Sequence, residues 1–388
     1  MVLRIAAIGC GDIAQRRHFP QIQALGGTAE LVAIAGRDPG RLRDCAARFG
    51  VPACYTDPAR MLRDEAIDAV LVLTSPESHA DHAELAVGAG KHVMVEKPLV
   101  RSPAEAARLV AAVRARQAIQ PLTFFALPHV ATAEHRLVAR LLGDGAIGAV
   151  TGAELHRGHR GPSHADWFYR RAVAGGGVLF DLGIYQLATI ATLLGPAVRM
   201  SALCARHFAT RTLDDGTVVT PDVEDSAMIS LLLEGGIAVG VHASWNGSLS
   251  HHATRARSVV FGREGTLHFG VADGAVYVFR PDGDYRGLPG DAAPARFDGA
   301  DCRQIRPDLP PGPLNIVGDF VADIRAGVHS TGSLDIQAHV LDIILGAYAA
   351  GSASIGAAHA LGLGRSDPPD PALPAMGKQD VRPHPVER

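Results

Sequence analysis

The sequence predicts an α/β fold in two domains: a doubly wound parallel sheet, then an α+β domain with an open, mostly antiparallel sheet. In the first domain, short apolar segments alternate with helical patterns, which is typical of a parallel sheet covered by helices on both faces. From residue 149 onward, strand-like segments follow one another with few helices between them, which indicates antiparallel pairing. We place the domains at residues 1–127 and 128–360, with a proline-rich tail at 361–388 that we expect to be disordered.

Composition and charge exclude several classes of protein. The 388 residues are 47% hydrophobic and 20% charged, and the net charge is −3. Without a long basic run, this balance predicts no nucleic-acid partner, and without an apolar run of about 18 residues it predicts no membrane span. The five cysteines show no CxxC spacing, which argues against a disulfide framework and a structural zinc site. We see no secretory signal pattern at the start and expect a cytoplasmic protein.

The first predicted strand, residues 3–8, leads into the pattern Gly9-Cys10-Gly11-Asp12-Ile13-Ala14. In such a G-x-G-x-x-A pattern the first glycine permits a tight turn, the second lets the backbone approach a pyrophosphate, and the small third residue packs the helix close to the strand. The start of the helix then offers unpaired N–H groups and the positive end of its dipole. We therefore predict a Rossmann domain that binds a dinucleotide through Gly9, Gly11, Asp12, Ile13 and Ala14.

The second predicted strand, residues 30–35, ends in Gly36-Arg37-Asp38. Proteins that prefer NAD usually place an acidic side chain here to bind the 2′-hydroxyl of the ribose. Gly36 leaves room and Arg37 can pair with a 2′-phosphate, so the sequence favours NADP over NAD. In the alternative, Arg37 stacks on adenine or stays in solvent while Asp38 contacts the ribose.

The remaining elements follow from apolar periodicity and from turn and cap residues. In the first domain, Ser102, Pro103 and Glu105 predict a capping box at the start of a helix. We predict further helices at 41–49, 79–88, 134–142, 181–194, 314–326 and 334–350. We predict strands at 67–73, 92–95, 122–127, 149–157, 197–206, 225–233, 236–244, 257–261, 265–269 and 275–279, and a long surface excursion at 281–315.

The strand at 92–95 ends in Glu96-Lys97-Pro98. Proline cannot continue a central strand, so the charged pair lies at the carboxyl end of a parallel strand, where open α/β sheets bind ligands. Only three of the 37 Lys and Arg residues are lysines. Because an ammonium can lose its proton and offers rotatable donors, Lys97 is a candidate for chemistry. The alternative is an ordinary lysine in solvent at the end of a strand.

Three glycines at 175–177 precede a helical pattern that contains Asp181 and Tyr185. These two residues are four apart, so a helix places them on one face, and the glycines allow a ligand to approach the backbone closely. A carboxylate and a phenol beside an ammonium could form a proton relay, because a nearby cation favours the phenolate in a carbonyl reduction. The alternative is a structural Asp at a helix start and a tyrosine in the core.

Together these motifs resemble the glucose–fructose oxidoreductase / inositol dehydrogenase / MocA (Gfo/Idh/MocA) family over about residues 3–350. The order and spacing of the pieces are more specific than any single motif. The matching pieces are Gly9-x-Gly11-x-x-Ala14, Thr74-Ser75-Pro76-Glu77-Ser78-His79 with His82-Ala83, Glu96-Lys97-Pro98, the Gly-Ala-Ile-Gly turn at 145–148, Asp166-Trp167-Phe168, Gly175-Gly176-Gly177 with Asp181 and Tyr185, and Asp225-Ser226-Ala227.

The resemblance implies an NAD(P)-dependent oxidoreductase that transfers a hydride between nicotinamide and a hydroxyl or keto carbon of a sugar, cyclitol or related polyol. It also implies a homodimer or homotetramer formed through the exposed face of the second sheet. Lys97 would be the catalytic lysine that hydrogen-bonds the reacting oxygen, and Asp181 would position the substrate and tune Lys97. Tyr185 stands where many members carry histidine, so the proton donor is either Tyr185 or Lys97.

The resemblance implies further contacts as well. Those with the cofactor would come from Thr74, Pro76, His79, Glu96 and Lys97. Those with the substrate would come from Lys97, His129, Arg157, Trp167, Asp181 and Tyr185. Many members carry a polar residue after the strand that ends here, whereas this chain has Ala126-Leu127-Pro128-His129. The assignment of His129 to the substrate therefore stays open.

Several aromatic and histidine side chains have two interpretations. Trp167 can stack on a sugar ring or close the core, and His242 and Trp245 face the same choice. His156, His159 and His164, with Asp166, could suggest a metal site. Their spacing fits neither a helical HExxH nor a zinc-finger pattern, so we predict no metal and a polar loop beside the substrate.

Two other functions remain open. One is a lyase or glycosidase in which bound NAD oxidises C3 of the sugar transiently and is then restored. The other is a non-catalytic sensor that keeps only the dinucleotide-binding fold. The combination of Lys97, Asp181 and Tyr185 argues against the sensor, because a protein that only binds a dinucleotide needs none of them together.

Overall fold

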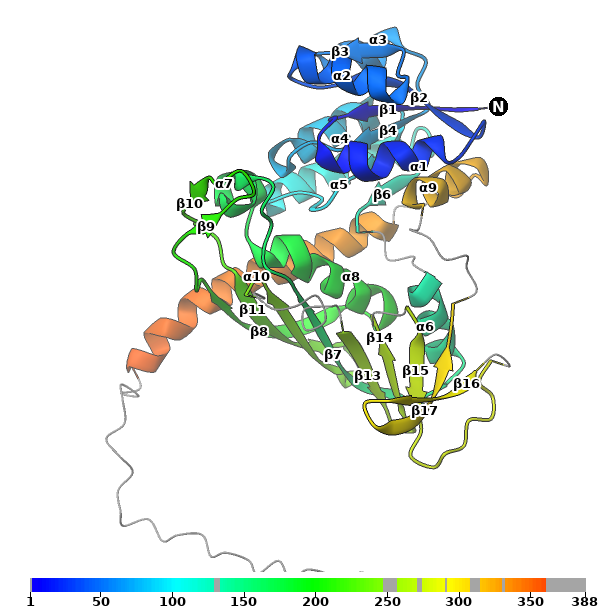
Figure 1. The fold of residues 1–388 in the computed structure, drawn as a ribbon, viewed down its shortest axis with the longest axis vertical. Helices are drawn as coiled ribbons and strands as arrows, with labels where there is room; N and C mark the ends of the chain where they lie inside the picture. The colour runs from blue at the N-terminus through cyan, green and yellow to red at the C-terminus, as the bar shows by residue number, and fades with distance from the viewer. Residues whose placement is uncertain are drawn as a thin grey trace, which may run out of the picture.

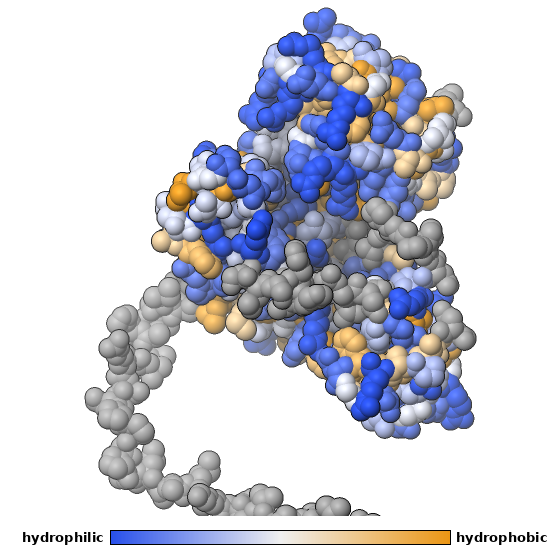
Figure 2. All heavy atoms as spheres, viewed as in Figure 1, coloured by the Kyte–Doolittle hydropathy of each residue, from blue (hydrophilic) through white to orange (hydrophobic). Residues whose placement is uncertain are grey.

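The computed structural model describes residues 2–128, 133–246, 257–270, 274–289, 292–307, 315–329 and 332–360, without the side chains of 332 and 351–360. His129 and the predicted tail at 361–388 lie outside the described residues. Two lobes are visible in Figure 1: a sheet covered by helices, coloured blue to cyan, and a larger sheet, coloured green to yellow, with helix α10 running between them. In the space-filling view a hollow separates the lobes, and its visible walls are mostly hydrophilic (Figure 2).

The first lobe is a six-stranded parallel sheet with the order β3-β2-β1-β4-β5-β6. This order is that of a doubly wound dinucleotide-binding fold, as predicted. The strands are β1 (Leu3–Ile8), β2 (Ala29–Ala35), β3 (Ala53–Tyr55), β4 (Ala69–Val72), β5 (His92–Val95) and β6 (Phe124–Ala126). The helices are η1 (Ala14–His18), α1 (Phe19–Gln23), α2 (Pro39–Phe49), α3 (Pro58–Asp64), η2 (Pro76–Ser78), α4 (His79–Gly88) and α5 (Pro103–Gln117).

Local sequence explains where the helices of this lobe begin. Asp38, Asp57 and Ser102 accept hydrogen bonds from backbone N–H groups at the starts of α2, α3 and α5, and each is followed by proline. The predicted capping box at α5 is only half present. Glu105 N–H donates to Ser102 Oγ, but the Glu105 carboxylate accepts from the N–H of Arg101 instead of that of Ser102. The Glu105 carboxylate also forms an ion pair with the Arg101 guanidinium. This ion pair holds the carboxylate at Arg101, one residue before the position that a capping box requires.

The second lobe contains a nine-stranded sheet with the order β16-β17-β15-β14-β13-β7-β12-β11-β8. Its strands are β7 (Val150–Gly158), β8 (Ala197–Ala205), β11 (Ser226–Leu233), β12 (Ala238–Ser244), β13 (Arg257–Gly262), β14 (Thr266–Phe269), β15 (Val276–Phe279), β16 (Ala293–Phe297) and β17 (Ala300–Ile305). The strands β9 (Arg211–Thr212) and β10 (Val218–Val219) form a separate hairpin. The helices are α6 (Ala133–Gly143), η3 (Asp166–Tyr169), α7 (Arg171–Ala174), η4 (Leu179–Gly183), α8 (Ile184–Leu193), η5 (Glu234–Gly236), α9 (Ile316–Arg325) and α10 (Gly332–Ala360).

Strands β7 and β12 pair in parallel, whereas the other pairings in this sheet are antiparallel. The register places Gly158 opposite Ser244, so both strands end at the same edge of the sheet. The residues that follow the two strands therefore emerge side by side, although they are more than 80 positions apart in the sequence.

The prediction of a surface excursion at 281–315 is wrong for residues 293–305. These residues form the hairpin of β16 and β17, which extends the sheet beyond β15. The turn is Asp298-Gly299, and both residues have positive φ, 50° and 84°. Such an Asp-Gly pair is a strong hairpin signal, because the type I′ turn requires positive φ at both central positions.

Helix α9 follows the second sheet in sequence but packs on the first. Ile316, Val317, Phe320 and Val321 belong to a buried cluster that also contains residues of β1, α1 and β6. The division at residue 127 therefore assigns this helix to the wrong core. Among the described residues, one helical stretch, Arg171–Leu193, is long and apolar enough to cross a membrane, but 78% of its apolar window of 18 residues is buried inside the protein, as in the core helix of a globular protein.

Candidate active site

The glycine loop after β1 has the geometry of a dinucleotide cradle. Gly9 has φ +105°, and a Cβ at this position would lie 2.6 Å from the Leu73 carbonyl carbon and oxygen, so no other residue fits. A Cβ on Gly11 would meet nothing within 4 Å, so the loop is open on that side. Ala14 is fully buried against the sheet, while Asp12 and Ile13 are exposed at the helix start. The loop therefore leaves room for a pyrophosphate beside the first N–H groups of the helix.

Glu96 is buried at the carboxyl end of β5, against the helical segment that follows the glycine loop. One carboxylate oxygen lies 2.8 Å from Nε2 of the buried His18, and the other accepts from the backbone N–H of Lys97 at 2.8 Å. Burial alone would raise the pKa of Glu96, but the His18 hydrogen bond and the charges of His18 and Lys97 lower it to about 2. Glu96 is therefore ionised, and it fixes the backbone from which the Lys97 side chain extends.

His79 is fully buried between two loops. Its Nε2 lies 2.9 Å from the Thr74 carbonyl oxygen, and its Nδ1 lies 2.7 Å from the Pro98 carbonyl oxygen. The ring thus joins the loop after β4, which includes the buried Pro76, to the loop after β5. Both ring nitrogens of His79 lie on protein carbonyl oxygens, so its polar atoms hold these two loops together.

Lys97 and Asp181 form a close ion pair across the two lobes. Lys97 Nζ lies 2.6 Å from Asp181 Oδ1 and donates also to the Asp181 carbonyl oxygen at 3.2 Å. The side chains are only 18% and 11% exposed. Burial would lower the pKa of Lys97 and raise that of Asp181, but their mutual attraction wins, so the pKa of Lys97 is raised and that of Asp181 is lowered. Both side chains are therefore charged at neutral pH.

The second carboxylate oxygen of Asp181 accepts from two side chains for which the sequence predicted no contact with Asp181. Trp245 Nε1–H donates to Asp181 Oδ2 at 3.1 Å, and His159 Nε2 lies 3.4 Å from the same oxygen. His159 Nδ1 accepts from the Gly161 N–H at 2.8 Å, so Nε2 carries the proton that faces Asp181. Trp245 is 1% exposed, so it donates this hydrogen bond from inside the protein.

Tyr185 lies beside this group under two cations. Lys97 Nζ is 5.6 Å from the centre of the Tyr185 ring, and the Arg157 guanidinium is 4.4 Å from it. Both distances are within the range of cation–π attraction. The predicted trio of Lys97, Asp181 and Tyr185 is thus assembled in one place, and Arg157 is added to it by the strand β7.

A buried carboxylate holds the glycine turn in front of Asp181. Glu224 accepts from the N–H groups of Gly177 and Leu179 at 3.1 Å and from the Tyr348 hydroxyl at 2.8 Å. A Cβ on Gly177 would lie 2.0 Å from the Glu224 carbonyl oxygen, which explains why this turn needs glycine. The helical segment that carries Asp181 therefore starts from a fixed position.

Several of the aromatic and histidine side chains considered from the sequence have ring partners of their own. The Trp167 ring stacks on the Phe168 ring, with their centres 3.7 Å apart. The His164 ring meets the same Phe168 ring edge-on. The rings of His156 and His242 pack on each other at 4.9 Å in the neighbouring strands β7 and β12. Within the part of the chain that the structure describes, no three His, Cys, Asp or Glu side chains are grouped so that they could hold a metal ion.

Comparison with known proteins agrees with this geometry. Residues 3–123 match the model of an oxidoreductase family with an NAD-binding Rossmann fold, and residues 135–268 match the GFO/IDH/MocA C-terminal domain. The chain belongs to the Gfo/Idh/MocA oxidoreductase family. The expected fold, with its parallel first sheet and mostly antiparallel second sheet, is confirmed.

Three members or neighbours of the Gfo/Idh/MocA family illustrate the match. A dTDP-3,4-didehydro-2,6-dideoxy-alpha-D-glucose 3-reductase of Streptomyces antibioticus is 31% identical over 84% of this chain and 89% of its own length. The protein of the same name from Actinomadura kijaniata is 35% identical, but the match spans 53% of this chain and 60% of that protein. The structure of levoglucosan dehydrogenase in complex with NADH superposes with a TM-score of 0.77 at 20% identity, covering 91% of this chain and 97% of that one.

The residues of this Gfo/Idh/MocA oxidoreductase fit a nicotinamide dinucleotide. The open side of Gly11 and the helix start at Asp12 and Ile13 would hold the pyrophosphate. Lys97, at the carboxyl end of β5, lies on the edge of the parallel sheet where such folds bind ligands. The bound cofactor would supply or accept a hydride there, and the protein would position the substrate and move its proton.

Proposed function

We propose that this oxidoreductase reduces a keto group of a sugar, or oxidises the corresponding hydroxyl, with Lys97, Asp181 and Tyr185 around the reacting carbon. The observation that carries the proposal is the Lys97–Asp181 ion pair beside Tyr185, held at the edge of the dinucleotide-binding sheet. A cation and a phenol at this edge are what a developing alkoxide needs for charge stabilisation and for a proton.

The raised pKa of Lys97 favours Tyr185 as the proton donor. Lys97 holds its proton strongly because Asp181 lies 2.6 Å away, so its ammonium acts as a fixed positive charge and hydrogen-bond donor. In the direction of reduction, the substrate oxygen gains negative charge, the Lys97 ammonium stabilises it, and the Tyr185 hydroxyl gives it a proton. Asp181 keeps Lys97 in place and accepts a substrate hydroxyl if one approaches.

The substrate that we propose is a hexose with a keto group at C3. The Streptomyces antibioticus relative, which matches along most of its length, is by its name a 3-reductase of a dTDP-linked keto sugar. Arg157 supports a ligand with oxygen-rich or anionic groups, because its guanidinium is presented on the Tyr185 ring at the site.

The test is a change in absorbance at 340 nm with the purified full chain, NADPH or NADH, and a panel of free keto sugars, dTDP-linked 3-keto sugars and inositols. Net oxidation or reduction of the cofactor with a sugar supports the proposal. Product formation without net change would replace it by transient oxidation with elimination. Dinucleotide binding without turnover of any sugar would favour a sensor.

We propose NADP as the preferred cofactor, on the basis of Gly36 and Arg37 at the end of β2. Asp38, the candidate partner for a ribose hydroxyl, is engaged instead at the start of α2, where its Oδ1 accepts from the N–H groups of Gly40 and Arg41. These two hydrogen bonds lower the pKa of Asp38. The exposed Arg37 is left to meet a 2′-phosphate.

Replacing Arg37 with glutamine should therefore weaken NADPH binding and spare NADH. Loss of a charge-assisted hydrogen bond to the phosphate should raise the Kd for NADPH about 10- to 100-fold. Fluorescence titration with each cofactor measures this, and Arg63→Gln, at the exposed end of α3, is the matched control. An equal loss for both cofactors would contradict the assignment of Arg37 to the 2′-phosphate.

We propose that the exposed face of the nine-stranded sheet joins subunits into a dimer or tetramer. Leu203 and Met228 lie opposite each other on β8 and β11, and they are 63% and 59% exposed, unusually high for large apolar side chains on a sheet.

We also propose a cytoplasmic location. All five cysteines are free thiols, which fits a reducing compartment.

Met228→Glu should therefore shift the native mass from a multiple of 40.6 kDa toward the monomer. A charge placed in the centre of an apolar interface would be buried without a partner, which opposes association. Light scattering coupled to size exclusion measures the mass. Ile119→Glu, at an even more exposed apolar residue of the first lobe, is the control that should leave the mass unchanged.

A further inference from the structure

The Asp-Ser-Ala motif at 225–227 lies outside the Lys97 site, and its aspartate anchors a different segment. Asp225 is buried where β11 begins, and its carboxylate accepts from the backbone N–H groups of His207 and Phe208 at 3.0 Å. The His207 ring lies 2.9 Å from Oδ1, and Arg211 Nη2 lies 3.4 Å from Oδ2. Asp225 thus fastens the segment between β8 and β9 and holds the positive charge of Arg211.

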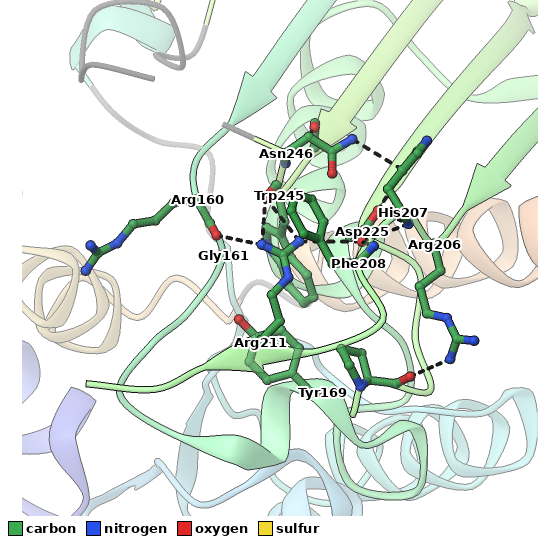
Figure 3. A network of polar contacts seen from close by, with 12 residues as sticks. Arg160, Gly161, Tyr169, Arg206, His207, Phe208, Arg211, Asp225, Trp245 and Asn246 are labelled. Atoms are coloured by element: carbon green, nitrogen blue, oxygen red, sulfur yellow. Dashed lines mark hydrogen bonds and ion pairs between the residues drawn. The ribbon is translucent and has the colours of Figure 1, made fainter. Parts of the chain in front are cut away.

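The Arg211 guanidinium connects two loops that are far apart in sequence. Nη1 donates to the carbonyl oxygens of Arg160 at 3.1 Å and Trp245 at 3.2 Å, and Nη2 donates to Trp245 O at 3.2 Å. Figure 3 shows Arg211 pointing up to these two backbones, with Asp225 to its right. The side chain is 11% exposed, and its guanidinium lies 3.8 Å from the centre of the Phe208 ring. This buried fork is therefore fixed by charge, by hydrogen bonds and by packing.

The two loops that Arg211 joins carry both donors to Asp181 Oδ2. One loop follows β7 and contains His159, directly before Arg160; the other follows β12 and begins with Trp245. The parallel pairing of β7 and β12 brings these loops to one edge, where the N–H groups of His159 and Trp245 donate to the carbonyl oxygens of Ser244 and Asp225 at 3.0 and 2.7 Å. These bonds hold the backbone N–H groups of the two residues, whereas the carbonyl oxygens of Arg160 and Trp245 face the Arg211 guanidinium. Arg211 adds a side-chain connection between the two loops.

We propose that Arg211 is a positioning residue for the reaction. By binding the carbonyl oxygens of Arg160 and Trp245, it holds the His159 ring and the Trp245 indole on Asp181, and through Asp181 it holds Lys97. A lysine could not replace it, because an ammonium is a point charge that lacks the planar fork needed to reach both carbonyls and Asp225 together. The inference rests on the proposed function, because the reaction is assigned to the same Asp181 and Lys97.

The first test does not depend on the substrate. The protein contains two tryptophans, so the full chain labelled with ¹⁵N-tryptophan gives two indole N–H signals, which Trp167→Phe assigns. In Arg211→Lys we expect the Trp245 indole signal to move toward the position of a free indole. Its hydrogen exchange should become about tenfold faster, because the loop opens more easily. If Arg211 had only a structural role, its replacement would lower the melting temperature but leave the Trp245 indole signal of the folded protein in place.

The matched control is Arg206→Lys in the same segment, because Arg206 donates to the Pro221 carbonyl and not to either loop. The control should leave the Trp245 signal and its exchange unchanged. If Arg211→Lys does not fold, Asp225→Asn provides the test, since it removes the charge that holds Arg211. A folded variant of either kind with a wild-type Trp245 signal and exchange rate overturns the proposal.

The second test uses the sugar reaction found for the wild type. Arg211→Lys should lower kcat by about 10- to 100-fold, because displacement of a positioned group by up to about 1 Å has effects of this size. In a background of Trp245→Phe, the same change should cost much less, since one of the two groups that Arg211 positions is already lost. Additive losses would overturn the proposal. A shifted Trp245 signal together with no sugar turnover by the wild type would support the contact and refute the proposed function.

Discussion

Replacing Lys97 with methionine should lower kcat for sugar reduction by about 10²- to 10³-fold, the loss expected when a donor to a developing oxyanion is removed. Methionine fills a similar volume but cannot stabilise negative charge on the substrate oxygen. The Kd for the dinucleotide should change much less, because the glycine loop holds the pyrophosphate. Stopped-flow measurement of cofactor absorbance gives kcat, and fluorescence titration gives the Kd.

Lys91→Met is the matched control for this prediction. Lys91 directly precedes the same strand, β5, and its Nζ donates to the Ile67 carbonyl at the opposite end of the sheet from Lys97. This variant should keep the kcat of the wild type. Unchanged kcat in Lys97→Met would remove the ammonium from the mechanism.

The pKa shifts also fix the sign of the pH dependence of stability. The pKa of Asp181 is lowered, so its contribution to stability is fully present above about pH 4, its ordinary value, and is lost as the pH falls. The pKa of Lys97 is raised, so its contribution is fully present below about pH 10 and is lost as the pH rises. The ion pair therefore stabilises the fold evenly between these limits, and Lys97→Met should lower the melting temperature by a constant amount over that range.

Tyr185→Phe should lower kcat by about 10²- to 10⁴-fold, the range for loss of a general acid. Phenylalanine keeps the ring beneath Lys97 and Arg157 but removes the hydroxyl, so packing and the cation–π contacts remain. The rate measured in heavy water should separate proton transfer from hydride transfer: the solvent isotope effect of the wild type should disappear or change in the variant.

Tyr55→Phe is the control for the hydroxyl. Tyr55 donates to Glu65 at 2.8 Å on the outer side of the first lobe, and its loss should leave kcat unchanged. If Tyr185→Phe keeps the kcat of the wild type, the proton must come from another group, and Lys97 becomes the candidate.

The central residues of the site could be predicted because each follows from a local rule. Lys97 stands where a parallel strand is stopped by proline, and such strand ends meet at the ligand-binding edge. Asp181 and Tyr185 are four residues apart in one helical stretch, behind glycines that only a close approach explains. The order of the motifs along the chain then indicated that Lys97 lies close to Asp181 and Tyr185 in the fold.

His159 and Trp245 could not be predicted in the same way. An alternating pattern identifies a strand but does not say which strand lies beside it or in which direction. The contact with Asp181 depends on the parallel pairing of β7 and β12 within a sheet that is otherwise antiparallel. For the same reason, His242 and Trp245 received the same interpretation from sequence, although one lies in β12 against His156 and the other lies on Asp181.

The return of α9 to the first sheet has a consequence for anyone who wishes to exchange parts of this enzyme. A nucleotide-binding module cut after residue 127 would leave Ile22 and Phe125 facing water where Phe320 and Val321 now cover them. Such a fragment would aggregate, and a chimera joined at that point would combine mismatched surfaces. Residues 316–325 should therefore be transplanted together with the first lobe.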